Sequence, residues 1–148
     1  MNRILLVEDN PSDESLTVVA FKRCGIANEV VVVHDGAAAL DYLFATGTYA
    51  GRDSSVLPRV VLLDLKLPKI DGLEVLRRIR ADERTHHLPV VVLTSSKQEE
   101  DVLSSYSLGA NAYVRKPVEF AEFAEAAKTL GLFWLLMNEP APAPRTPQ

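Results

Sequence analysis

Cysteine is nearly absent from this sequence, with Cys24 as the single example among 148 residues. One cysteine excludes an internal disulfide, and it also excludes a metal site built from a cysteine cluster. Cys24 falls among the apolar positions of a predicted helix. We therefore expect a buried thiol that carries no chemistry.

Long hydrophobic runs and concentrated positive charge are absent as well. The apolar run at residues 4–7 is followed at once by two acidic residues, and it is far too short for a membrane span or a signal-peptide core. We expect a cytoplasmic protein with no membrane partner. The chain has 16 basic and 20 acidic side chains, a net charge of −4 and no run of Lys and Arg. Nucleic acid is not an expected partner, because binding it needs a concentrated basic face.

The sequence does contain an alternation of β-branched runs with amphipathic stretches. We predict strands at residues 3–7, 29–33, 60–63, 89–93 and 111–114. Helical spacing of apolar residues follows each run, and the last helix is predicted over residues 119–137. The predicted buried faces of the first four helices are, in chain order, Leu16, Val19, Ala20 and Cys24; Ala37, Leu40, Leu43 and Phe44; Gly72, Val75, Leu76 and Ile79; and Val102, Leu103 and Tyr106.

This fivefold alternation of strand and helix predicts an α/β fold. Its short crossovers must be right-handed, so they generate a parallel sheet that is covered on both faces. Five strands favour the flavodoxin-like doubly wound order 2-1-3-4-5, with five helices. The length fits one domain, which we place at residues 1–138 with an extended last helix. Residues 139–148 hold four of the nine prolines and are expected to form a disordered or polyproline-like tail.

Three acidic residues stand directly after predicted strands. Glu8 and Asp9 follow the first strand, and Asp64 follows the third. These strands are neighbours in the predicted order, about 4.8 Å apart, so the carboxylates can converge at the switch point where such sheets bind ligands. Clustered carboxylates need a cation, and Mg²⁺ suits oxygen ligands together with a phosphate. Acidic residues also stabilise helix starts, but three at adjacent strand ends favour phosphoryl chemistry.

The remaining strand ends carry groups that suit a phosphoryl oxygen. The fourth strand leads to Thr94, a hydroxyl donor, and the fifth leads to Lys116, a mobile ammonium group. Taken alone, Thr94 could be a helix cap and Lys116 a solvated lysine. Pro117 follows at the strand-to-helix corner, where a cis peptide bond is one option.

These residues, in this order and at these strand ends, resemble the signature of response-regulator receiver domains of two-component systems. The run LDLKLPKIDG at residues 63–72 is similar to the family's segment around its phosphorylated aspartate. The run GANAY at residues 109–113 is similar to the family's approach to its fifth strand. The resemblance covers residues 2–130 and is specific as a set.

The resemblance implies a phosphoacceptor and a metal site. Asp64 takes the phosphoryl group from a phosphohistidine on a sensor histidine kinase. Asp9, Asp64 and the backbone carbonyl of Lys66 hold Mg²⁺, and Glu8 assists through water. Such a transfer needs mainly positioning and charge neutralisation. The protein is therefore expected to signal rather than to act as an enzyme on other substrates, catalysing its own phosphorylation and dephosphorylation alone.

The resemblance also implies a switch. Thr94 and Lys116 engage the phosphoryl oxygens after transfer, Thr94 moves inward, and Tyr113 rotates with it. Pro117 is the third predicted switch residue. The altered surface is then read by a downstream protein whose identity the sequence does not give.

A narrower likeness concerns the kinase. The run DNPSD at residues 9–13, the long polar loop at residues 46–58 and the run FWLL at residues 133–136 are similar to small stand-alone regulators that partner bacterial phytochromes and related kinases. This implies a phytochrome kinase as the phosphoryl donor.

The predicted last helix is apolar almost all round at residues 130–137. One face must pack on the sheet, and the remainder predicts an exposed apolar patch of the kind that marks a protein contact. We predict a twofold homodimer through this patch, unless the helix end is covered by the domain's own surface. The predicted dimer residues are Leu132, Phe133, Trp134 and Leu136.

Two other functions remain open. An aspartate-nucleophile phosphohydrolase would also use Mg²⁺, but such enzymes resemble an Asp-x-Asp arrangement, and Lys66 stands where the second acid belongs. A receiver fold that has lost its switch would be a phosphorylation-independent interaction module, although such domains usually lack a key residue that this chain keeps.

Overall fold

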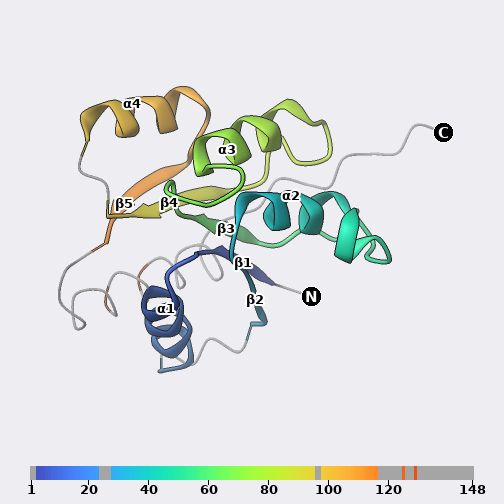
Figure 1. Cartoon of the computed structure of the whole chain (residues 1–148), viewed down its shortest axis with the longest axis horizontal. Coiled ribbons are helices and arrows are strands. Elements are labelled where there is room, and N and C mark those ends of the chain that lie inside the picture. The colour runs from blue at the N-terminus through green and yellow to red at the C-terminus, as the bar shows by residue number, and fades with distance from the viewer. Residues whose placement is uncertain (1–2, 24–27, 96–97, 117–124, 126–128, 130–148) are drawn as a thin grey trace.

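The computed structural model describes residues 3–23, 28–95, 98–116, 125 and 129 (Figure 1). Every predicted strand is present, and each strand end lies within one residue of its predicted position. The elements in chain order are β1 (Ile4–Val7), α1 (Pro11–Arg23), β2 (Val30–Val33), α2 (Gly36–Phe44), the short 3-10 helix η1 (Gly47–Tyr49), β3 (Val60–Leu63), α3 (Gly72–Ala81), β4 (Val90–Thr94), α4 (Glu99–Ser107) and β5 (Ala112–Arg115).

The five strands form one parallel sheet in the order β2-β1-β3-β4-β5, which confirms the predicted doubly wound topology. Leu6 of β1 pairs with Val32 of β2 on one side and with Leu62 of β3 on the other. All strands therefore end at the same edge of the sheet, here called the carboxyl edge, and begin at the opposite one, the amino edge. The switch point of the fold lies at the carboxyl edge between β1 and β3.

Helices cover both faces of this sheet, and alternate strand residues enter two separate cores. Figure 1 shows α1 on one side of the sheet and α2, α3 and α4 on the other. Leu5, Val7 and Leu63 pack with α2 and α3, whereas Ile4 and Leu6 pack with α1. Because both faces of each central strand are buried, the strand sequences are apolar throughout instead of alternating.

Two predicted helix faces are wrong in part. In α1 the buried residues are Thr17, Ala20 and Phe21, while Val19 is exposed. The polar Thr17 can be buried because its hydroxyl donates to the carbonyl of Asp13 at 2.8 Å.

In α4 two of the predicted buried residues, Leu103 and Tyr106, are instead 61% and 51% exposed, while Ser105 is buried. The Ser105 hydroxyl donates to the carbonyl of Asp101 at 2.7 Å, which satisfies it inside the fold. In α3 all four predicted residues are buried, as expected.

Several sequence predictions lie outside the described residues. They are Cys24, Pro117 and its peptide bond, the helix at residues 119–137 apart from Glu125 and Thr129, the tail at residues 139–148, and the dimer residues Leu132, Phe133, Trp134 and Leu136. These stay predictions. Among the residues that are described, each helix is too short or too polar to cross a membrane.

Candidate functional site

Backbone hydrogen bonds hold Glu8 and Asp64 side by side at the carboxyl edge. The Glu8 N–H donates to the carbonyl of Val33 at 3.0 Å, and the Asp64 N–H donates to the carbonyl of Val7 at 3.1 Å. The parallel ladder thus continues one residue beyond β1 and β3. Both carboxyl-bearing residues are held at the switch point by the same hydrogen bonds that build the sheet.

Glu8, Asp9 and Asp64, here called the acidic trio, converge as predicted. One carboxylate oxygen from each lies within 4.8 Å of the others. Glu8 is 2% exposed and Asp64 is 7% exposed, whereas Asp9 is open to solvent. Burial raises the pKa of Glu8 from 4.5 to about 7, and hydrogen bonds with Lys116 and with the backbone of Asn10 limit that rise. Three hard oxygen donors around one partly open point fit a divalent cation such as Mg²⁺ or Mn²⁺.

Lys116 neutralises part of this negative charge. Its Nζ donates to Glu8, to Asp13 at 2.9 Å and to Asp64 at 2.9 Å. Burial opposes the charge on Lys116, but these three hydrogen bonds outweigh burial and raise its pKa. The sequence predicted a mobile ammonium at the rim, and the structure instead has a side chain that is 6% exposed and fully engaged.

Asp13 is the site residue that the sequence reasoning missed. It lies in the first turn of α1, where acidic residues are common for reasons of helix stability alone. The available signal was its spacing of four from Asp9, which places both at the same end of the helix. Its partner Lys116 lies 103 residues away in the sequence, so no local sequence pattern predicts the contact.

The loop from β3 to α3 closes over Asp64. The N–H of Lys66 donates to Asp64 Oδ1 at 3.2 Å, and the N–H of Gly72 donates to the carbonyl of Leu65 at 3.0 Å. A Cβ at Gly72 would come within 2.2 Å of the Asp64 carbonyl oxygen, so a side chain at this position would displace the loop from β3 to α3. The role of the Lys66 carbonyl as a metal ligand stays a prediction.

The two remaining predicted residues lie on the neighbouring strands. Thr94 ends β4 and is fully buried, and its carbonyl accepts the N–H of Lys116 at 2.8 Å. Tyr113 lies in β5 opposite Val92 and packs, partly buried, against the core under α2 and α3. The structure therefore brings Thr94 next to Lys116 in the backbone ladder, while the movement of Thr94 and Tyr113 stays a prediction.

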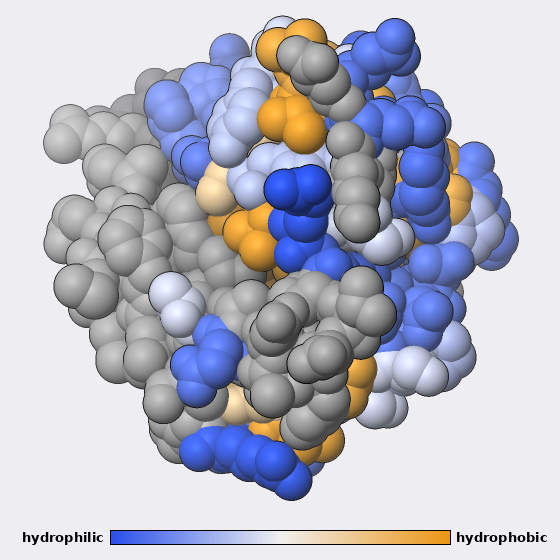
Figure 2. Space-filling view, turned by 90° about the vertical axis from the view of Figure 1, so that its left-hand side faces the viewer, coloured by the Kyte–Doolittle hydropathy of each residue, from blue (hydrophilic) through white to orange (hydrophobic). Residues whose placement is uncertain are grey.

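The surface around the site is mostly polar. Figure 2 views the molecule from the side at which the strands end, and hydrophilic residues cover most of the coloured part of this face, with small hydrophobic areas between them. A cavity of about 330 Å³ opens beside the loop from β3 to α3. It is lined by Leu65, Lys66, Leu67, Asp71, Leu73 and Asp101.

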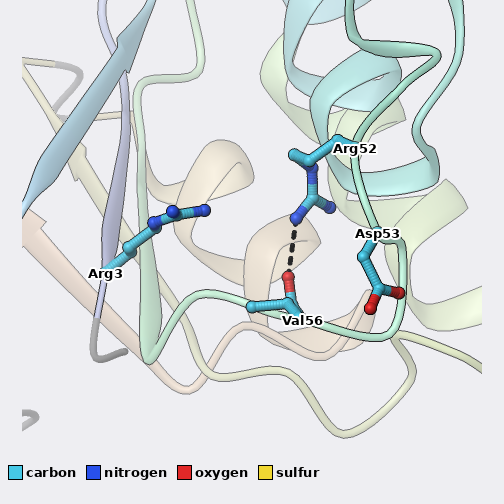
Figure 3. A pocket seen from close by; sticks show the side chains of 4 residues that line it. All are labelled: Arg3, Arg52, Asp53 and Val56. Atoms are coloured by element: carbon cyan, nitrogen blue, oxygen red, sulfur yellow. Dashed lines mark hydrogen bonds between the residues drawn. The ribbon is translucent and has the colours of Figure 1, made fainter.

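A second cavity, of about 370 Å³, lies at the amino edge. Figure 3 shows Arg3, just before β1, extending toward the loop that carries Arg52, Asp53 and Val56. The Arg52 guanidinium donates to the carbonyl of Val56 at 2.7 Å, along the dashed line in Figure 3. This part of the loop at residues 46–58 is thus tied down at the far end of the molecule from the carboxylates.

Curated proteins that are similar to this chain over most of their length include the following two relatives. A probable methanogenesis regulatory protein, FilR2 of Methanothrix harundinacea, is 44% identical over 141 residues, which cover 95% of this chain and 88% of FilR2. Response regulator Rcp1 of Synechocystis is 39% identical over 132 residues, covering 89% of this chain and 88% of Rcp1.

Solved structures agree with these relatives. The Mn²⁺-bound form of Rcp1 superposes with a TM-score of 0.88 at 36% identity, over 96% of this chain and all of that one. The phosphorylated cyanobacterial phytochrome response regulator RcpA gives 0.88 at 39% identity, over 94% and 97%. The bacteriophytochrome response regulator AtBRR gives 0.74 at 56% identity, over 94% and 99%.

The family follows from these likenesses together with the geometry of the carboxyl edge. The family model of the response regulator receiver domain matches residues 4–128, which is most of the chain. With the sheet order 2-1-3-4-5 and the acidic trio at its switch point, this chain belongs to the response regulator receiver domain family, and its relatives include phytochrome-associated regulators.

Proposed function

We propose that this protein is a single-domain response regulator that accepts a phosphoryl group on Asp64 from a sensor histidine kinase. The observation that carries the proposal is the convergence on Asp64 of two further carboxylates and of the Lys116 ammonium. An acceptor carboxylate that is 7% exposed, next to a buried cation, has the surroundings that a transferred phosphoryl group needs.

The transfer requires little covalent chemistry from the protein. An Asp64 oxygen forms the new O–P bond while the P–N bond of a phosphohistidine breaks, and the imidazole nitrogen leaves with the electron pair. The Lys116 ammonium offsets the negative charge brought to the buried site. The Thr94 hydroxyl, buried next to Lys116, is the proposed second donor to the phosphoryl oxygens.

Asp9, Asp64 and Glu8 are the residues that would hold Mg²⁺, with the Lys66 carbonyl as the proposed backbone ligand. When bound, the ion supplies charge neutralisation and orientation of the phosphoryl oxygens. The existence of a Mn²⁺-bound form of the related Rcp1 supports divalent-ion binding by this protein.

The proposed phosphoryl donor is a phytochrome kinase. The support is the 56% identity to the bacteriophytochrome response regulator AtBRR and the likeness to phosphorylated RcpA. FilR2, at 44% identity, is a probable methanogenesis regulatory protein and not a phytochrome regulator by name. The kinase must therefore be identified by phosphotransfer profiling against the kinases of the host. The Asp64→Ala variant is the control, because it should take no phosphoryl group from any of them.

Intact-mass spectrometry after incubation with acetyl phosphate and Mg²⁺ tests the acceptor. We expect a gain of one phosphoryl group that is labile to hydroxylamine and is lost in Asp64→Asn. No gain in the wild type would favour a phosphorylation-independent interaction module. Turnover of a generic phosphate ester, abolished in Asp64→Asn, would instead favour a phosphohydrolase.

The output is proposed to leave through protein contacts, by a homodimer and an unidentified downstream protein. The homodimer is proposed through Leu132, Phe133, Trp134 and Leu136, on the sequence pattern alone. Light scattering of Trp134→Glu tests it, since an unchanged dimer mass would remove the idea.

A further inference from the structure

Lys116 has a partner, Asp13, that belongs neither to the acidic trio nor to the sheet. Asp13 accepts a hydrogen bond from Lys116 Nζ at 2.9 Å, equal to the distance to Asp64. An ammonium group has three N–H donors, and Glu8, Asp13 and Asp64 occupy all three. Because the Lys116 side chain is 6% exposed, these charge-assisted bonds are largely shielded from water and are correspondingly strong.

Asp13 differs from the other two partners in what the proposed reaction does to them. Asp64 loses its carboxylate charge when it becomes an acyl phosphate. Glu8 belongs to the three oxygen donors that lie within 4.8 Å of one another and fit a divalent cation, and Asp13 does not. The Asp13 contact is therefore the one that can persist from the resting state through the transfer.

The backbone around Asp13 is built to hold this carboxylate in place. Asn10 Oδ1 accepts the N–H of Ser12 at 2.9 Å and the N–H of Asp13 at 3.1 Å, which starts α1 with a side-chain cap. Thr17, buried against the sheet, donates its hydroxyl to the Asp13 carbonyl at 2.8 Å. The ion pair thus joins a capped helix start to the end of β5.

We propose that Asp13 is a positioning residue for Lys116, an inference that rests on the proposed role of Asp64. Its carboxylate holds the ammonium beside Asp64, so the positive charge is already in place when a phosphoryl group arrives. Preorganised charge needs no rearrangement at the moment of reaction, and the loss of an orienting contact slows the step. An acid that merely stabilises the start of α1 would not act through Lys116.

The first test is the rate of Asp64 phosphorylation by acetyl phosphate and Mg²⁺, followed by intact mass. We expect Asp13→Asn to lower this rate about 10-fold, as the loss of one charge-assisted bond predicts. Asp13→Glu should recover most of the rate. Glu14→Gln is the matched control, because it removes the same charge from the same helix turn, where Glu14 pairs with His34, and it should keep the wild-type rate.

The second test does not depend on phosphorylation. In urea unfolding without metal, Asp13→Asn should destabilise the wild type and should cost at most half as much in a Lys116→Met background. A wild-type rate for Asp13→Asn, or equal destabilisation in both backgrounds, overturns the positioning role. If wild-type Asp64 takes no phosphoryl group, the proposed function and this inference both fail. If the wild type is phosphorylated and Asp13→Asn has the same rate, this inference alone fails.

Discussion

The two edges of the sheet hold their charges in opposite ways. At the carboxyl edge, Lys116 is shared among three carboxylates, and Asp9 adds a fourth nearby. At the amino edge, Arg3 pairs with Glu29 at 3.0 Å, but Arg52 and Arg80 bind neutral backbone carbonyls instead. Arg52 donates to the carbonyls of Tyr42 and Val56 at 2.7 Å each and to the carbonyl of Leu43 at 3.3 Å.

Arg80 repeats this arrangement at the amino ends of β4 and β5. Its guanidinium donates to the carbonyl of Leu88 at 2.7 Å, to the carbonyl of Gly109 at 2.9 Å and to the side chain of Asn111 at 2.9 Å. These bonds satisfy carbonyls at loop and helix ends. The carboxyl edge instead keeps an excess of negative charge that a cation would complete, which is the physical difference between a structural and a functional cluster.

The largest expected effect follows from removing the counter-charge of the carboxyl edge. Lys116→Met leaves Glu8 and Asp64 buried without their cation, so we expect the metal-free protein to lose about 3–5 kcal/mol of unfolding free energy. Saturating Mg²⁺ should restore part of this loss, because it binds the folded state. Urea unfolding with and without Mg²⁺ measures both. A loss below about 1 kcal/mol would show that the carboxylates neutralise themselves by protonation.

The next effect is a pH dependence that comes from Glu8. Its pKa is raised from 4.5 to about 7 in the folded state, so its contribution to stability is full below pH 4.5 and is lost as pH rises through 7. The shift corresponds to at most about 3 kcal/mol. We expect the metal-free wild type to lose stability between pH 5 and pH 8 relative to Glu8→Gln, measured by urea unfolding at each pH. The pKa of Glu74 is lowered to about 2 by its bonds to Arg77. Glu74 is present in both proteins, so its contribution to the pH dependence of stability cancels in the comparison.

Parallel curves for the wild type and Glu8→Gln would contradict this prediction. They would mean that Lys116 keeps Glu8 ionised in the folded state down to its ordinary range.

The amino edge should respond without any dependence on metal. Arg80→Ala leaves the carbonyls of Leu88 and Gly109 without their donor, and we expect a loss of about 2 kcal/mol. The loss should be the same with and without Mg²⁺ in urea unfolding. Arg77→Ala on the same helix is the control, since its pair with Glu74 is exposed to solvent and should contribute little to stability. An Arg80→Ala loss that Mg²⁺ repairs would erase the distinction between the edges.

The sequence predicted the charged residues of the carboxyl edge well and those of the amino edge not at all. Glu8, Asp9 and Asp64 could be found because each stands directly after an apolar strand, and parallel strands end together. Arg52 and Arg80 have no such signal, because their acceptors are backbone carbonyls, which every residue type carries. The positions of the strands can therefore be predicted from the sequence, while the charged side chains that bind the carbonyls of loop ends cannot.

The misread helix face has a similar origin. Leu103 and Tyr106 have helical spacing, but α4 buries Ser105, whose hydroxyl is satisfied by its own helix, so polarity alone misleads there. Asp13 was missed because its contact with Lys116 spans 103 residues, and an acid in a first helix turn is common without a partner.

The smallest expected effect tests whether the amino edge needs geometry or merely charge. Arg52→Lys keeps the cation, but an ammonium cannot reach the carbonyls of Tyr42, Leu43 and Val56 together, nor stack flat over the Tyr42 ring, whose centroid lies 4.2 Å from the guanidinium carbon. We expect a loss of about 1 kcal/mol, with phosphorylation of Asp64 unchanged. Arg78→Lys is the matched control, because Arg78 pairs with Glu74 at the surface at 3.4 Å and should change stability little. If Arg52→Lys is as stable as the wild type, the positive charge at residue 52 is sufficient and the shape of the guanidinium is not needed. The two edges would then differ in the charge of the groups around the cation, and not in the geometry that the cation must have.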